Sequence, residues 1–119
     1  MFATVDVTHW RQSNEVALSA VQVRFVLGIK TRDTWLKCKD AANLSSKGDF
    51  FTRSDIAEIL KVRLFISARP GENSYERYSC HRNQPALLAA KFRQWGIDLD
   101  GRLIRVNEAI DQLQKGQIK

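Results

Sequence analysis

The sequence is poor in cysteine and proline, and it has no long apolar run. Its 119 residues include two cysteines and two prolines, and two cysteines in a chain of this length do not form a disulfide framework. No stretch approaches the roughly 20 apolar residues of a transmembrane helix. The opening MFATVDVTHW lacks the basic and apolar segments of a secretory signal peptide. We therefore expect no membrane association, a cytoplasmic location and two reduced thiols.

The chain also lacks a linker that would divide it into domains. No low-complexity run and no stretch rich in proline, glycine and serine interrupts it. The fractions of hydrophobic residues (44%) and charged residues (27%) are those of a folded globular protein. We expect a single domain over residues 1–119, with a C-terminal helix at 104–115 available for self-association.

Enzyme signatures are missing as well. The sequence has no phosphate-binding glycine loop, no nucleophile elbow and no HExxH pair. Cys80 and His81 are adjacent, but Cys38 and His9 lie far from them, whereas zinc half-sites are paired at short spacing. A metal site or a Cys–His dyad built from these four residues is conceivable but not expected. We predict no catalytic residue, no metal and no cofactor.

What the chain does have is positive charge, and most of it lies in the middle. The formal net charge is +6. Residues 24–82 hold twelve Lys and Arg against seven Asp and Glu, whereas residues 1–23 hold one against two. A basic surface attracts nucleic acid, an acidic membrane or an acidic protein, although it also serves solubility alone. A polyanion is therefore expected to bind the middle of the chain.

Apolar periodicity and capping residues predict a helix-rich chain. Thr52 followed by Asp55 is an acidic variant of the capping box. Ile56, Ile59 and Leu60 then form one apolar stripe that we expect to be buried. The same reasoning predicts a strand over 2–9 and helices over 15–27 (capped by Ser13 or Asn14 and ended by Gly28), 31–43, 52–61, 85–95 and 106–114.

One or two β-hairpins are expected between these helices. Val62–Ile66 is rich in β-branched and aromatic residues, Pro70-Gly71 is a turn signal, and Ser74–Cys80 can return as the second strand. Asp100-Gly101, flanked by short apolar runs, is a second hairpin signal. The expected fold class is therefore α+β: a helix-rich small domain with one or two β-hairpins, in a helix-turn-helix or winged-helix arrangement.

Two segments resemble bacterial helix-turn-helix and winged-helix proteins. Thr52–Val62 looks like the first helix and turn of that family, with Ala57 as the small residue at the helix crossing. Leu18–Trp35 resembles the helix-turn-helix of small excisionase-type proteins, with Gly28 at the turn, and departs from that pattern at Arg24, where the family has a small residue. The two segments can be laid over each other, which either a repeat or two chance amphipathic helices would explain.

The resemblance implies that the helix after Gly28 enters the major groove of DNA. A recognition helix carries long polar side chains near its N-terminus, and a wing is a basic hairpin. The first role is assigned to Lys30, Thr31, Arg32, Lys37 and Lys39. The second is assigned to Arg63, Arg69, Arg77 and Arg82, interleaved with Tyr75 and Tyr78, and Arg53 completes the predicted nucleic-acid-binding set.

We therefore expect a DNA-binding protein without enzymatic activity. It would be a small regulator, or an architectural or recombination accessory factor of bacterial or mobile-element type, that binds duplex DNA as a homodimer. Val106, Ile110 and Leu113 are the candidate self-association residues. The alternative is a protein-interaction module, an inhibitor or adaptor, that binds the acidic surface of a protein partner.

Overall fold

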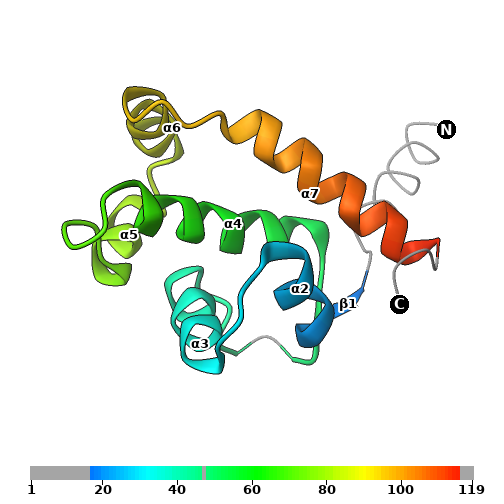
Figure 1. Ribbon diagram of the computed structural model, residues 1–119. Helices are drawn as coiled ribbons and strands as arrows, with labels where there is room; N and C mark the ends of the chain where they lie inside the picture. The colour runs from blue at the N-terminus through cyan, green and yellow to red at the C-terminus, as the bar shows by residue number, and fades with distance from the viewer. Residues whose placement is uncertain (1–16, 47, 116–119) are drawn as a thin grey trace, which may run out of the picture.

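The computed structural model describes residues 17–46 and 48–115, and its centre is the helix α4 (Arg53–Ala68). The other described elements, in chain order, are β1 (Leu18–Ser19), α2 (Ala20–Leu27), α3 (Arg32–Ala41), β2 (Phe50–Phe51), α5 (Tyr75–His81), α6 (Pro85–Gln94) and α7 (Leu99–Gln114). Figure 1 shows α4 running through the middle of the molecule, with α7 on one side of it and α2 and α3 on the other. α5 and α6 lie near the end of α4.

The start of α4 follows the predicted capping box. The Asp55 backbone N–H donates to the Thr52 hydroxyl at 3.2 Å, and the Asp55 carboxylate accepts from the Thr52 backbone N–H at 2.9 Å. The stripe of Ile56, Ile59 and Leu60 is buried as predicted. Both predictions held because they rest on contacts within two turns of one helix.

α4 does not end at Lys61, so the strand predicted over Val62–Ile66 is wrong. The helix continues to Ala68, and no turn follows Leu60. Val62, Leu64 and Phe65 are all buried, since α4 packs against α3, α5 and α7. The β-branched and aromatic residues of this segment favour a strand locally. They are helical here because the neighbouring helices bury them on several sides of α4.

The segment after α4 is a turn followed by a helix, and the wing predicted there is wrong. Gly71, at φ 89°, occupies the predicted turn, and the Asn73 side chain donates to the Phe65 carbonyl at 2.7 Å. The Ser74 hydroxyl then accepts from the Arg77 backbone N–H and caps α5. Because a side-chain cap satisfies a free helical N–H, the segment that contains Tyr75 and Tyr78 forms a helix and no strand.

The second predicted hairpin, at Asp100-Gly101, is also wrong. Asp98 caps α7, and its carboxylate accepts from the Gly101 backbone N–H at 3.1 Å. A side-chain carbon at residue 101 would collide with that carboxylate. The glycine therefore serves a helix cap rather than a hairpin turn.

The helix predicted over 106–114 is the second half of α7, and its apolar face is used within the chain. Ile110 is fully buried, and Val106 and Leu113 pack against the core. α7 contacts both α2 and α4. Of the three residues assigned to self-association, Ile110 is therefore a core residue, and Val106 and Leu113 are partly buried at the edge of the core.

The sheet of the described chain is a single antiparallel pair of two-residue strands. Leu18 pairs with Phe51, and Ser19 pairs with Phe50. With six helices in the described residues, the fold is the expected helix-rich α+β class. The strand predicted over 2–9 and the caps Ser13 and Asn14 lie outside the described residues; the described helix begins at Ala20, with Ser19 as its cap.

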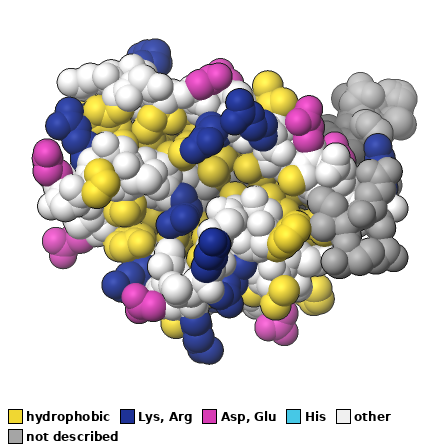
Figure 2. Space-filling model, in the orientation of Figure 1, with side chains coloured by type: hydrophobic (Ala, Val, Ile, Leu, Met, Phe, Trp, Pro, Cys, Tyr) yellow, Lys and Arg dark blue, Asp and Glu magenta, His cyan; other side chains and the backbone are white. Residues whose placement is uncertain are grey.

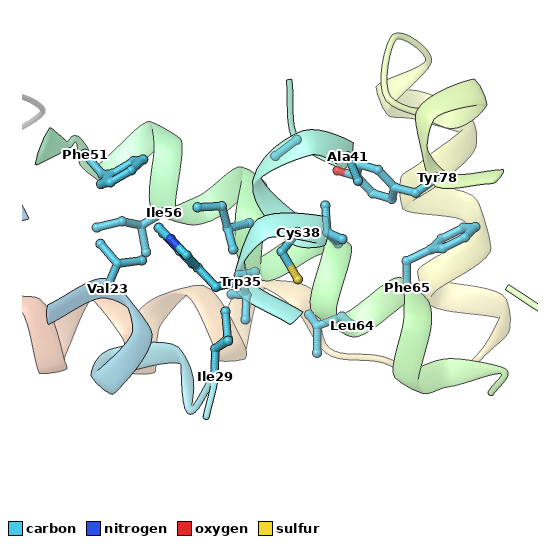
Figure 3. Packing of buried hydrophobic residues seen from close by; sticks show 14 of the residues in the cluster. Val23, Ile29, Trp35, Cys38, Ala41, Phe51, Ile56, Leu64, Phe65 and Tyr78 are labelled. Atoms are coloured by element: carbon cyan, nitrogen blue, oxygen red, sulfur yellow. The ribbon is translucent and has the colours of Figure 1, made fainter. Parts of the chain in front are cut away.

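One apolar core joins these elements. Figure 3 shows Trp35 of α3 beside Val23 and Ile29, with Cys38 and Tyr78 farther along the same core. Ala57 instead borders a hollow between α4 and α7 that Leu103 and Val106 also line, so it does not lie at the predicted close crossing. Among residues 17–46 and 48–115, no helix has the length and apolar content needed to cross a membrane.

Candidate nucleic-acid interface

α2 and α3 are two short helices joined by the turn 28–31, as predicted for Leu18–Trp35. Gly28 adopts the left-handed conformation (φ 70°), and the Ile29 backbone N–H donates to the Arg24 carbonyl at 2.9 Å. The Thr31 hydroxyl accepts from the Thr34 backbone N–H at 3.2 Å and caps α3. Glycine after the last turn and threonine before the first are the residues that these backbone positions favour.

The Arg24 side chain forms hydrogen bonds with the backbone of this turn. Its guanidinium donates to the Ile29 carbonyl (Nε, 3.4 Å) and to the Lys30 carbonyl (Nη2, 2.9 Å). α3 packs against α4 and α5, and α2 packs against the strands and α7. Sequence reasoning treated Arg24 as a departure from the family pattern. A signal was present, since an arginine in the last turn of a helix can reach the carbonyls that follow.

Three of the predicted contact residues lie together at the exposed start of α3. Lys30, Thr31 and Arg32 are all exposed, and neither Lys30 nor Arg32 makes an ion pair with any described residue. With the Arg24 guanidinium on the Lys30 carbonyl, they form what we call the α3 N-terminal cluster (Arg24, Lys30, Thr31 and Arg32). The free N–H groups of a helix start add to this positive field.

The rest of the exposed face of α3 is close to neutral. The Lys37 ammonium pairs with Asp33 at 3.1 Å, and Asp40 accepts from the Ser45 hydroxyl at 3.1 Å. Leu36, between them, is exposed. Attraction for an anion is therefore strongest at the N-terminal end of the helix.

Lys39 differs from the other cations of α3. Its Nζ lies 5.7 Å from the centre of the Trp35 ring and 5.8 Å from that of Phe51. These two rings pack edge to face, with centroids 5.3 Å apart. Lys39 is half-buried over this pair, where a cation gains from the ring electrons. It belongs to the edge of the core as much as to the surface.

Two of the predicted contact arginines hold the fold together. The Arg53 guanidinium pairs with Asp111 and donates to Asn107 at 3.2 Å, which ties the start of α4 to α7. The Arg82 Nη1 donates to the Ala41 carbonyl at 2.7 Å, which ties α5 to the end of α3. Both side chains are committed to partners within the chain.

The remaining arginines of the predicted wing do not lie on one hairpin. Arg63, on α4, is half-buried near Cys38 and Tyr75. Burial raises the pKa of the Cys38 thiol, and the positive charge of Arg63 partly opposes that rise. Arg69 and Arg77 lie in the turn after α4 and on α5, where both contact Glu72. The α4–turn–α5 unit thus spreads these charges over different surfaces.

Figure 2 shows the resulting charge distribution on one face. Lys and Arg side chains gather over α3 and across the middle of this face, with apolar side chains between them. The structure therefore brings together Lys30, Thr31 and Arg32 and adds Arg24. Arg53 and Arg82 instead bond to partners within the chain, and Arg69 and Arg77 contact Glu72.

The cysteines and the possible metal ligands of the described residues are other groups that could carry chemistry. Cys38 is buried and Cys80 exposed, and both are free thiols. In residues 17–46 and 48–115, no three His, Cys, Asp or Glu side chains lie close enough together to hold a metal ion. Comparison of the chain with protein-family models, curated proteins and solved structures finds no match.

Proposed function

We propose that the protein binds duplex DNA in the cytoplasm through the α3 N-terminal cluster, as a small regulator or an accessory factor of recombination. The observation that carries this proposal is a pair of exposed cations, Lys30 and Arg32, at the start of α3, directly after the capped turn that joins it to α2. Neither cation makes an ion pair with a described residue. Long cationic side chains at that place meet phosphates and base edges when the helix lies in the major groove.

The binding mechanism follows from the contacts within the cluster. Lys30 and Arg32 neutralise backbone phosphates, which releases counterions and makes affinity dependent on salt. Arg24 keeps the turn rigid, so the two side chains start from a fixed backbone. Lys37 adds a third contact by exchanging Asp33 for a phosphate, since an exposed ion pair is worth only about 0–1 kcal/mol.

One copy presents one recognition helix, so we expect binding as a dimer or beside a partner protein. The Val106, Ile110 and Leu113 face is largely packed within the chain, which leaves little of it for a dimer contact. The described residues on the outer face of α2 are the better candidates: Val21 is 74% exposed and Phe25 62% exposed.

The test is a charge-matched pair of double variants. K30A/R32A should weaken binding to a duplex and lower the slope of log affinity against log salt by up to about two units. R102A/R105A removes the same charge from exposed positions of α7, which lies on the other side of α4 from α3 (Figure 1). This control should change the slope by less than about one unit. Equal effects of the two variants would place the site elsewhere.

The second candidate function is an adaptor or inhibitor that binds an acidic protein. The exposed Val21 and Phe25 favour it, because apolar side chains on an outer helix face are typical of protein contacts. An adaptor would show no retention of any duplex at low salt, whereas a DNA binder retains even unrelated duplexes weakly. Duplex retention at low salt therefore separates the two functions.

A further inference from the structure

A basic hollow lies at the end of α4, away from the α3 N-terminal cluster. It has a volume of about 220 Å³ and opens to solvent between the C-terminal part of α4, α5 and α6. The lining residues that matter here are Phe65, Arg69, Arg77, His81, Lys91 and Trp95. The DNA-binding proposal assigns no role to this hollow.

The inner side of the hollow is aromatic. The Phe65 and Trp95 rings pack edge to face with centroids 5.5 Å apart, and the His81 ring lies 5.5 Å from that of Phe65. Phe65 is buried and anchored in the core, whereas Trp95 is half-buried. A rigid aromatic wall of this kind favours the edge or face of another ring.

The rim of the hollow carries an excess of positive charge. Arg69, Arg77 and Lys91 are opposed by one acidic lining residue, Glu72, whose carboxylate lies 3.8 Å from the Arg69 guanidinium. Arg77 donates one of its five N–H groups to the Glu72 backbone carbonyl at 3.2 Å. Lys91 makes no ion pair with any described residue. Donors therefore remain for an anion at this rim.

The size of the hollow limits what it can hold. Pockets for drug-sized ligands measure about 300–1,000 Å³, and a dry cavity of about 150 Å³ accepts one benzene ring. A hollow of about 220 Å³ matches a single ring with a small polar group.

We propose that this hollow binds a small aromatic anion, one ring bearing a carboxylate or a phosphate. The ring packs against the half-buried Trp95 and His81 rings, which Phe65 supports from the core, and the anionic oxygens accept from Arg77 and Lys91. Charge-assisted hydrogen bonds of this kind are about twice as strong as neutral ones.

The test titrates the folded protein with phenyl phosphate and with benzoate, and follows the Trp95 indole N–H signal in ¹H–¹⁵N spectra. The signal is assigned with Trp95→Phe. Inorganic phosphate and benzyl alcohol are the controls for charge alone and for the ring alone. Lys91→Gln is compared with Arg93→Gln, which removes an exposed cation from the same helix but not from the hollow.

The expected result is a saturable shift of the Trp95 signal by at least one of the two aromatic anions. Lys91→Gln should weaken that binding about fivefold, while Arg93→Gln should change it less than about twofold. No saturation by either anion, equal binding of inorganic phosphate, or equal loss in the two variants would overturn the proposal. None of these readouts involves DNA, so failure here leaves the duplex-binding proposal intact.

Discussion

Several arginines of the described residues are bonded to partners within the chain. Arg24, Arg53 and Arg82 each donate to a carbonyl or carboxylate within the chain. For Arg53 and Arg82 the partner lies 58 and 41 residues away in sequence. No local pattern reveals such a partner, and both arginines were therefore predicted to contact DNA. Lys30 and Arg32 were placed correctly at an exposed helix start, because Gly28 and Thr31 mark that start locally.

A change at Arg82 should therefore affect stability and leave DNA binding largely unchanged. Arg82→Gln removes the hydrogen bond to the Ala41 carbonyl and should lower the free energy of unfolding by about 1–3 kcal/mol. Urea denaturation measures this loss, with Arg93→Gln, an exposed cation on α6, as the control. The salt slope of DNA binding should shift by less than about one unit. If the denaturation midpoint is unchanged and the salt slope of DNA binding is lower, Arg82 contacts DNA and this assignment is wrong.

Three side-chain protons make stability depend on alkaline pH, those of the buried Cys38 and Tyr78 and of the half-buried Tyr75. Burial is the main cause that raises the pKa of Cys38, Tyr75 and Tyr78 above their ordinary values. For Tyr78 the negative charge of Glu58 adds to the rise. When folding raises the pKa of a group, that group stabilises the folded protein. Its contribution to the free energy of unfolding is fully present at pH values below its pKa in the unfolded chain, and it is lost as the pH rises through its pKa in the folded protein.

We thus expect the free energy of unfolding to be constant near neutral pH and to fall from about pH 8.5 upward, as the unfolded thiol and then the unfolded phenols ionise. Urea denaturation at several pH values checks this. Tyr78→Phe should make the decline shallower. It should cost little at neutral pH, because the Tyr78 hydroxyl is buried without a hydrogen-bond partner among the described residues. Stability that rises with pH over this range would contradict the assignment.

At the scale of the element, the ends of helices were more predictable than their lengths. Thr52, Gly28 and Pro85 mark helix ends through contacts made within one or two turns, and the structure has helix ends at all three. The strand predicted over Val62–Ile66 failed because the identity of that segment depends on α3, α5 and α7 around it. Burial against these helices, and not local propensity, thus determines the secondary structure of the segment.

The central position of α4 predicts where the chain is most sensitive to mutation. Leu60→Ala removes a buried side chain from the middle of α4 and should lower the free energy of unfolding by about 2–5 kcal/mol. Val21→Ala, on the exposed face of α2, should change it by less than about 0.5 kcal/mol. Chemical denaturation of the two variants tests this contrast. Similar midpoints would mean that α4 is not the centre of the core.

At the scale of the whole molecule, the fold decides where the positive charges of residues 24–82 are exposed. The positive excess of residues 24–82 was visible in the sequence, but its distribution was not. The fold commits Arg53 and Arg82 to internal contacts and directs Arg69 and Arg77 to the hollow beside α6. The α3 N-terminal cluster is an exposed, cationic helix start, and we propose that a DNA backbone contacts it.

The most direct test of this account is a titration of a fluorescent duplex with the purified protein, repeated over a range of salt. We predict a dissociation constant in the micromolar range or lower at about 50 mM salt. Contacts from Lys30, Arg32 and Lys37 should give a slope of log affinity against log salt of about −2 to −3. A flat titration at about 50 mM salt, with the protein shown to be folded, would contradict the proposal that this protein binds DNA.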